Sequence, residues 1–549
     1  MNSPTHWLAP LLLAALCLAS PAAGRDQLGH RWLFVRGDLR NPPDVERALA
    51  LLPRAAAAGY NAVVLDMYLD PAGAQKLTAA ARQCHLDLIP TVMGGLVGAD
   101  RNLAEGVPVK DALFVAHGGT AAFVQDTPTP IPGGDFETAD GDRFQGWEMQ
   151  DDPGVTTFAD HEAVHGGRTS LRMDHIGAGN PYGNCRLARP VTLHPFRQYL
   201  LKVWVKTDGF ADPGLVDVKL LTDDGKLRPI SYQSLGLRPT QDWTLHYLGF
   251  NSLDHTSALL YLGVWGGKGG RIWWDDLSLE EVGLLNVLRR PGTPVSVRSE
   301  SGVVFEEGRD FEPIRDPNLH PWVTYHELPV IRLTPATRIR EGERLRVSYY
   351  HPVIIYEDRI DTCLSEPEVF ALWREQIERA DQLLHPPAFF MSHDEIRVAN
   401  WCQACQSRHL TPAQLLADNV RRAVAIIREI RPDAEIWVWS DMFDPHHNAV
   451  DDYYLVNGSW RGSWEGLSPQ VGIANWRGGE RDTMEWFAGR GHRQVLCGYY
   501  DGDEDGAGIA RWRDLGHGLP GLVGAMYTTW QDRYGAMEAW AKQAWGETP

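Results

Sequence analysis

Two neighbouring carboxylates, Asp394 and Glu395, follow a run of apolar residues, with Ser392 and His393 between. The run at residues 388–391 (AFFM) is typical of a buried strand, and the polar residues begin where that strand would end. In a parallel α/β barrel the strand ends supply the catalytic face. Because neighbours along a strand point to opposite sides, we expect one carboxylate to donate a proton and the other to orient or stabilise a substrate. The alternative is an acidic pair that caps the next helix, and these residues alone favour neither interpretation.

Apolar runs that end in polar residues or glycine recur along the chain, with helical segments between them. Three precede residue 94, at residues 32–38, 61–66 and 86–93. Four follow the 388–391 run, at residues 435–440, 472–476, 494–500 and 523–530. Alternation of strand and helix at this spacing predicts a parallel sheet, and eight strands are the number of a (β/α)₈ barrel. We therefore predict an α/β fold, a TIM barrel formed by residues 25–108 and 353–549.

The segment between the two barrel parts has short strands, many turn residues and almost no helical periodicity. Residues 131–285 carry the pattern of an all-β jelly roll or β-sandwich. The flanking β-rich segments, a hairpin at 109–130 and residues 286–352, are predicted to form one small β unit around the jelly roll. The insertion thus falls between the third and fourth barrel strands.

The bulk composition limits the class of protein and its partners. At 549 residues the chain is long enough for two or three domains, and its net charge of −19 argues against a nucleic-acid partner. Its 21 tryptophans suit a protein that stacks on sugar rings. No pattern in the sequence indicates an oligomeric state.

Residues 1–24 are predicted to be a signal peptide. A short apolar run at residues 8–19 precedes small residues suited to cleavage, although no Lys or Arg lies before it. The run is too short to span a membrane, and no other segment qualifies. We expect an exported protein, secreted or periplasmic, without a membrane span.

Aromatic and acidic side chains gather at the predicted ends of the barrel strands. Besides the central pair, they are Asp66, Trp439, Asp441, Trp476, Tyr499, Tyr500, Asp501, Trp530 and Asp532. Aromatic rings stack on the apolar faces of sugars, carboxylates accept hydrogen bonds from hydroxyl groups, and one acid can protonate the bridging oxygen. The set predicts an oligosaccharide or glycoconjugate substrate and calls for no catalytic cofactor.

The barrel segments resemble glycoside hydrolase family 20, the β-N-acetylhexosaminidases. The resemblance rests on the Asp-Glu pair after the fourth strand and on VWSDMF (438–443), CGYYDGD (497–503) and MYTTWQD (526–532). It implies a retaining mechanism in which the substrate's own 2-acetamido oxygen is the nucleophile and forms an oxazolinium ion. Glu395 would then be the general acid/base, and Asp394 would orient and stabilise the acetamido group.

The same resemblance assigns roles to other residues. Tyr499 or Tyr500 would donate a hydrogen bond to the acetamido oxygen. Either Arg36 or Arg40 would hold sugar hydroxyls. Three tryptophans would line the sugar pocket and three carboxylates would bind hydroxyls: Trp439, Trp476, Trp530, Asp441, Asp501 and Asp532.

The chain departs from the family pattern at two places. His393 stands where the family has glycine, and it either tunes Glu395 or fills space against a neighbouring strand. The third predicted strand, with Pro-Thr-Val at residues 90–92, lacks an acidic residue. Two alternatives therefore stay open: a glycosidase for another sugar, with altered roles for the carboxylate pair, and a glycan-binding barrel without activity.

Motifs across the jelly-roll segment resemble carbohydrate-binding modules of families 4, 9 and 22. They include GDFE (134–137), GRTSLRM (167–173) and IWWDDLSL (272–279). The resemblance implies a structural calcium ion between the first and last strands, with Glu137 and Asp276 as candidate ligands. The alternative is that both are ordinary turn carboxylates. Such a module either binds glycan or only packs against its neighbour.

Six cysteines lie outside the predicted signal peptide, and only Cys402 and Cys405 are close in sequence. Their C-x-x-C spacing, with His409 four residues on, is compatible with zinc. The spacing alone is weak evidence, so a local disulfide or free thiols are favoured over a metal. A second cluster, Asp444 with His446 and His447, falls in a predicted loop and carries little weight.

Overall fold

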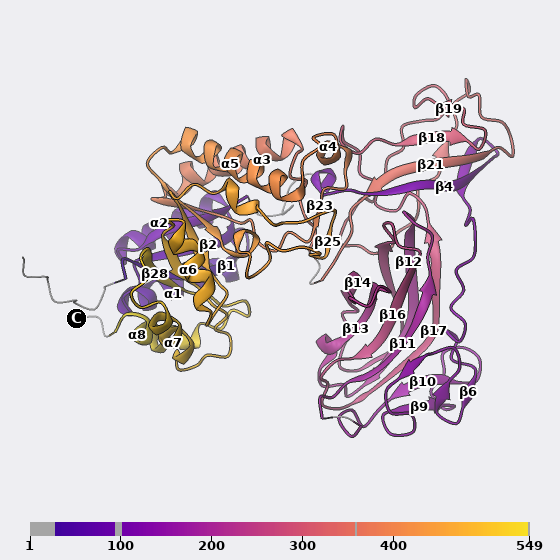
Figure 1. Ribbon diagram of the computed structural model, residues 1–549, viewed down its shortest axis with the longest axis horizontal. Helices are drawn as coiled ribbons and strands as arrows, with labels where there is room; N and C mark the ends of the chain where they lie inside the picture. Colours follow the sequence, from indigo (N-terminus) through magenta and orange to yellow (C-terminus); the bar gives the residue numbers. More distant parts are fainter. Residues whose placement is uncertain (1–27, 94–100, 180, 357–358, 547–549) are drawn as a thin grey trace, which may run out of the picture.

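The computed structural model describes residues 28–93, 101–179, 181–356 and 359–546, and its centre is a closed parallel barrel (Figure 1). In their order around the barrel, the strands are β1 (His30–Asp38), β2 (Ala62–Tyr68), β3 (Asp87–Val92), β22 (Ala388–Met391), β24 (Glu435–Trp439), β26 (Val471–Asn475), β27 (Gln494–Leu496) and β28 (Leu522–Tyr527). The barrel closes at β1, where Trp32 lies opposite Ala62 on one side and Met526 on the other. The predicted TIM barrel is confirmed.

Helices cover the outside of the barrel. They are α1 (Pro42–Ala57), α2 (Pro71–Gln83), α3 (Pro367–Leu384), α5 (Pro412–Ile430), α6 (Arg481–Gly489), α7 (Ala507–Leu515) and α8 (Met537–Trp545). Between β24 and β26 the described chain has short 3₁₀ turns in place of an α-helix. The sequence sets the start of α5 through a capping box, in which Thr411 and Gln414 satisfy each other's backbone N–H.

Large aromatic side chains fill the interior of the barrel. Trp32 and Trp437 meet edge to face, with ring centroids 4.9 Å apart. Gly472 on β26 makes room for this packing, because a Cβ atom there would lie 2.3 Å from the Trp437 ring. The interior is therefore a packed core, and chemistry is confined to the mouth of the barrel.

The insertion leaves the barrel after β3 and returns before α3. The chain segments before and after the jelly roll form a six-stranded antiparallel sheet. Its strands are β4 (Val107–His117), β5 (Thr120–Phe123), β18 (Ser296–Ser299), β19 (Val304–Phe305), β20 (Ile331–Arg332) and β21 (Arg344–His351). β4 and β21 pair along most of their length, so chain segments from both sides of the jelly roll share one sheet.

The jelly roll consists of two five-stranded sheets packed face to face. One contains β15 (Gln241–Asn251), β12 (Gln198–Asp208), β17 (Arg271–Val282), β10 (Ser170–Met173) and β9 (Thr157–Asp160). The other contains β14 (Pro229–Ser234), β13 (Val216–Thr222), β16 (Ser257–Val264), β11 (Cys185–Thr192) and β8 (Met149–Gln150). Alternate residues of both sheets, such as Leu201, Val218 and Leu262, form its core. The jelly roll lies beside the barrel in Figure 1, with β13 and β14 towards it.

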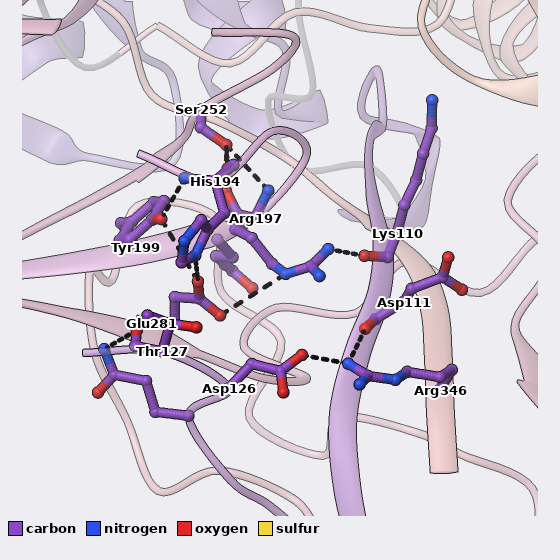
Figure 2. A network of polar contacts seen from close by, with 12 residues as sticks. Lys110, Asp111, Asp126, Thr127, His194, Arg197, Tyr199, Ser252, Glu281 and Arg346 are labelled. Atoms are coloured by element: carbon purple, nitrogen blue, oxygen red, sulfur yellow. Dashed lines mark hydrogen bonds and ion pairs between the residues drawn. The ribbon is translucent and has the colours of Figure 1, made fainter. Parts of the chain in front are cut away.

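A buried polar network joins the jelly roll to the small sheet (Figure 2). At its centre the Glu281 side chain, only 1 % exposed, pairs with His194 Nδ1 at 2.7 Å and Arg197 Nε at 3.6 Å. Arg197 in turn donates to the carbonyl oxygen of Lys110 on β4. Arg346 of β21 pairs with Asp126 in the segment leading from the small sheet into the jelly roll. Because these charges are paired, the two parts of the insertion are held in one orientation.

No helix in the described part of the chain is long and apolar enough to cross a membrane. The predicted signal peptide, residues 1–24, lies outside the described residues.

Replacing Glu281 with Gln should destabilise the insertion. The change removes the buried carboxylate that the partly buried Arg197 guanidinium pairs with, which costs about 2 kcal/mol in the free energy of unfolding. Glu280→Gln is the matched control, since Glu280 is 44 % exposed where it pairs with Lys202, and its loss should cost under about 1 kcal/mol. Urea unfolding of both variants checks this. Equal effects would show that the network contributes little.

Candidate active site

A cavity of about 330 Å³ opens at the carboxyl ends of the barrel strands. Side chains from β1, β2 and β24 and from the loops after β22 and β28 line it, together with residues 359–364 on the return from the insertion. Its polar and aromatic lining residues include Arg36, Asp66, Trp322, Arg359, Asp361, Trp373, Ser392, His393, Asp394, Trp439 and Trp530. The predicted site thus assembles in part, and it gains residues that the sequence did not single out.

Arg36 and Asp66 form one wall of the cavity. The Arg36 Nε atom lies 3.8 Å from Asp66 Oδ2, and Thr91 Oγ1 donates to Asp66 Oδ1 at 2.9 Å. Burial raises the pKa of Asp66 above its ordinary value, an effect that the Thr91 hydrogen bond and Arg36 only partly offset. Arg40 lies outside the cavity, paired with Asp38 at 2.6 Å. Of the two candidate arginines, Arg36 is therefore the one placed to contact a ligand.

Asp394 lines the cavity in contact with a half-buried cation, Arg359. Arg359 Nη2 donates to its Oδ2 at 2.7 Å, and Arg359 Nη1 donates to its carbonyl oxygen at 3.0 Å. Burial acts to raise the pKa of Asp394, but the charge and hydrogen bond of Arg359 outweigh it and hold the pKa below its ordinary value. Asp394 is therefore ionised at neutral pH.

Glu395 is turned differently from Asp394. Its φ of +47° lies in the left-handed region, which few residues other than glycine adopt. Its carboxylate contacts Arg397 Nη2 at 2.8 Å and Arg359 Nε at 3.5 Å, and it is not among the residues that line the cavity. The two carboxylates therefore differ in orientation, as predicted. The cause is this turn in the backbone at Glu395 and not strand alternation, because β22 ends at Met391.

Asp441 lies fully buried behind the pair and supports that turn. Its Oδ2 accepts the backbone N–H of Glu395 at 2.8 Å and Asn448 Nδ2 at 2.8 Å, while its Oδ1 accepts Trp476 Nε1 at 3.1 Å. Burial and the nearby charge of Asp394 raise the pKa of Asp441 to about 7. Asp441 and Trp476 are outside the cavity lining, so they hold the loop of the pair instead of contacting a ligand there.

Indole rings supply the apolar wall. Trp439 is packed edge to face on Phe390, with ring centroids 4.8 Å apart, and presents little free surface. Trp530 is 36 % exposed and lies under the Arg36 guanidinium, 5.4 Å from its ring centroid. Trp322 reaches the cavity from the insertion and is 38 % exposed. An apolar wall facing carboxylates and guanidinium groups suits a sugar ring, which has both kinds of surface.

His393 is buried and held in one tautomer. The Asn419 amide donates to the Leu364 carbonyl, so its oxygen faces His393 Nε2 at 3.0 Å, and that nitrogen carries the proton. Burial lowers the pKa of His393 to about 4, which keeps the ring neutral. The ring packs against Trp373, and this arrangement fits the space-filling role rather than tuning of Glu395.

Four predicted site residues that follow the last two barrel strands in the sequence do not line the cavity: Tyr499, Tyr500, Asp501 and Asp532. Tyr500 belongs to the core, because it is 4 % exposed and packs on Tyr527 and Trp540 outside the barrel. Asp501 is also buried and accepts the N–H groups of Trp530 at 2.7 Å and Gln531 at 3.1 Å. It therefore positions Trp530, and the prediction that it binds hydroxyls directly is corrected.

The other two lie at the surface. Tyr499 is 58 % exposed, and its hydroxyl accepts a hydrogen bond from Gln531 Nε2 at 2.8 Å. The Asp532 side chain is 46 % exposed, and its Oδ2 lies 3.8 Å from Arg47 Nη2.

The sequence did not identify Arg359, Asp361 or Trp322. Asp361 accepts the backbone N–H groups of Arg397 and Val398, at 2.8 and 2.7 Å, and burial raises its pKa to about 6. Arg359 and Asp361 lie close before the α3 helix, in a run of charges that could have drawn attention as the insertion rejoins the barrel. Trp322 carries no such signal.

In the jelly roll, Glu137 and Asp276 lie against the same loop. Glu137 Oε1 accepts the N–H groups of Arg168 and Thr169, at 2.8 and 3.1 Å, and Asp276 Oδ2 contacts His165 Nδ1 at 2.7 Å. Both carboxylates thus have protein partners, and calcium binding stays a prediction.

A second cavity, of about 390 Å³, lies where the jelly roll meets the barrel. Tyr232, Tyr261 and Trp265 of the jelly roll line it together with Tyr454 of the barrel. The ring of Tyr232 also lies against that of Tyr356, with centroids 4.6 Å apart. The aromatic face of the module therefore borders the barrel.

Comparison with known proteins gives similarity of fold only. No protein-family model matches the chain, and no curated protein matches it. Among solved structures, a glycoside hydrolase family 20 β-N-acetylglucosaminidase is similar over 95 % of this chain and 70 % of its own, with 10 % identity and a TM-score of 0.33. A chitobiase from Flavobacterium johnsoniae is similar over 35 % and 31 %, with 14 % identity and a TM-score of 0.26.

The inserted module has its own structural relatives. A family 4 carbohydrate-binding module is similar over 28 % of this chain and 100 % of its own, with 16 % identity and a TM-score of 0.22. At such identities and scores the similarities carry no argument about activity.

Asp441 should make the stability of the barrel depend on pH. Its pKa rises from an ordinary 3.8 to about 7 on folding, so its contribution is fully present below pH 3.8 and is lost as the pH rises through about 7. In Asp441→Asn, the free energy of unfolding should fall less between pH 4 and pH 8 than in the wild type, by up to a few kcal/mol. Urea unfolding across that range measures it, with Asp433→Asn on the exposed loop before β24 as the control. Parallel curves for Asp441→Asn and the wild type would contradict the assignment.

Proposed function

We propose that this protein is a glycoside hydrolase that binds a neutral saccharide in the cavity at the mouth of the barrel. The cavity has the size of a small-ligand site and combines indole surface with carboxylates. Its placement at the strand ends is where TIM-barrel enzymes carry their chemistry.

One observation carries the proposal: the pKa values of two carboxylates in the same cavity are shifted in opposite directions. Arg359 holds the pKa of Asp394 below its ordinary value, whereas burial raises the pKa of Asp66. Glycosidases need such a division, since one carboxyl protonates the leaving oxygen while a charged one stabilises the opposite side of the ring.

The finer proposal is a retaining β-N-acetylhexosaminidase that uses substrate assistance. In that mechanism Asp394 would accept the acetamido N–H and stabilise the positive charge of the oxazolinium ion. Its fixed charge and its position in the cavity support this role. The indole of Trp530, with Arg36 above it, would hold the sugar ring and its hydroxyls.

Two residues are candidates for the proton donor. Asp66 lines the cavity and has a raised pKa, so we place it first. Glu395 is the donor that the Asp-Glu pattern implies, and its side chain is 23 % exposed. For Glu395 to act, its carboxylate would have to leave Arg397 and turn into the cavity.

Kinetics with two leaving groups separates the candidates. The wild type should hydrolyse 4-nitrophenyl β-glycosides of N-acetylglucosamine or N-acetylgalactosamine, and Asp394→Asn should lose at least about 10²-fold in kcat. A variant that lacks the acid should lose far more activity on a methyl glycoside than on a 2,4-dinitrophenyl glycoside, because only the poor leaving group needs protonation. We expect this pattern for Asp66→Asn.

Glu395→Gln and Asp38→Asn complete the set. The leaving-group pattern in Glu395→Gln and not in Asp66→Asn would move the acid to Glu395. Asp38→Asn, which removes a carboxylate outside the cavity, should leave kcat unchanged. A wild type that hydrolyses no glycoside but binds saccharides in calorimetry would replace the proposal with the glycan-binding alternative.

Removing either exposed indole should weaken saccharide binding. Trp530→Ala and Trp322→Ala each delete apolar surface that a sugar ring would cover, about 1.4 kcal/mol or tenfold in KM. The Trp322 variant also tests whether the insertion contributes to the site. Tyr182→Ala, on the jelly roll and 78 % exposed, is the control and should leave KM unchanged.

A further inference from the structure

Three buried cysteines and one buried glutamate converge where the insertion joins the barrel. They are Glu105, Cys363, Cys402 and Cys405, each no more than 2 % exposed. One donor atom from each lies within 4.8 Å of all the others. Only the C-x-x-C pair is close in sequence: Cys402 is the N-cap of the short helix α4 (Gln403–Gln406), and Cys405 lies within it.

The separations between these atoms match the edges of a tetrahedron around one ion. With Zn–S near 2.3 Å and Zn–O near 2.0 Å, tetrahedral edges are about 3.8 Å between sulfurs and about 3.5 Å between sulfur and oxygen. Cys363 Sγ lies 3.4 Å from Cys402 Sγ and 3.7 Å from Cys405 Sγ. Glu105 Oε2 lies 3.6 Å from Cys402 Sγ and 3.8 Å from Cys405 Sγ.

The glutamate is oriented as a ligand would be. Glu105 Oε1 accepts the backbone N–H groups of Trp401 at 2.8 Å and Cys402 at 2.9 Å, which leaves Oε2 facing the thiols. Among the described residues, no ion pair joins Glu105 to a cation. Buried carboxylates in proteins are paired or coordinate a metal, and backbone hydrogen bonds of this kind commonly orient a ligating carboxylate.

We propose that Glu105, Cys363, Cys402 and Cys405 bind one structural zinc ion. Binding would release the thiol protons, since thiolate is the ligand form. Four protein donors with no exposed face make a closed site, as in structural rather than catalytic zinc centres. His409, which the C-x-x-C spacing suggested as a partner, is exposed and is not in the group.

A disulfide fits this geometry less well than a metal. Bonded sulfurs lie about 2.05 Å apart, whereas Cys363 is nearly equidistant from two sulfurs at almost twice that separation. A disulfide would also use only two of the three thiols that converge with Glu105 Oε2.

The ion would fasten the candidate active site to the insertion. Glu105 N–H donates to the Asp361 carbonyl at 2.7 Å, and Cys363 N–H donates to the Leu103 carbonyl at 3.0 Å. The chain leaving the barrel therefore already pairs with the chain returning to it. Cys402 and Cys405 add the loop after β22, which carries Asp394. One ion would thus hold Arg359 and Asp394 on segments fixed to a common point.

Metal analysis of the full-length protein tests the proposal. Protein purified without chelating resin should contain about one zinc per chain by inductively coupled plasma mass spectrometry. The variants Cys402→Ser, Cys363→Ser and Glu105→Gln should each lose most of this zinc. Cys185→Ser, which removes a buried thiol in the jelly-roll core, is the matched control and should keep the metal.

A second measurement covers variants that fail to fold. Cobalt replacing zinc in the wild type should give thiolate charge-transfer bands and the intense visible bands of a tetrahedral site. Zinc release on treatment with a chelator should lower the unfolding midpoint of the wild type. Protein that takes up neither ion after reduction, or whose peptides show a Cys402–Cys405 disulfide, would overturn the proposal.

Discussion

The candidate site depends on one half-buried cation. Arg359 contacts the carboxylates of both Asp394 and Glu395 and also the backbone of Asp394. A carboxylate at the mouth of a packed barrel would otherwise lose its charge to burial, as Asp441 behind it partly does. The guanidinium therefore lowers the pKa of Asp394, while the pKa values of Asp66 and Asp441 are raised.

Arg359 does not come from a barrel strand. It lies where the chain returns from the insertion, and Asp361 and Trp322 reach the same cavity from this region. The insertion is consequently part of the site as well as a neighbour of it. Polar contacts hold the insertion in its orientation at two places. The Glu281 network lies inside it, and Asp452 pairs with Lys226 and Arg228 where it contacts the barrel.

Rigid attachment matters because a site made of distant segments loses geometry when any one of them moves. Three segments meet at one point: the chain leaving the barrel, the chain returning to it and the segment after β22. At that point lies the group formed by Glu105, Cys363, Cys402 and Cys405. A closed metal centre there would fix these segments relative to one another.

The errors of prediction at residues 499–501 have a common physical cause. The apolar run at residues 494–500 predicts that residues 499–501 stand at the end of a barrel strand, but β27 ends at Leu496, and beyond it the chain no longer alternates between two faces. Tyr500 therefore turns into the core, and Asp501 turns towards the backbone of the next loop. Asp66, Trp439 and Trp530 lie on or just after the strands that carry them, and their placement at the cavity follows from strand direction alone.

The sequence by itself determined the barrel, the place of the insertion and the position of Asp394 just after a barrel strand. Each of these depends on hydrophobic periodicity and on the direction of parallel strands, which are local properties. The tertiary structure alone decided which arginine faces Asp394, which way Glu395 turns, and that Cys363 and Glu105 join a C-x-x-C pair. Those outcomes depend on contacts between segments far apart in the chain, and no local pattern encodes such contacts.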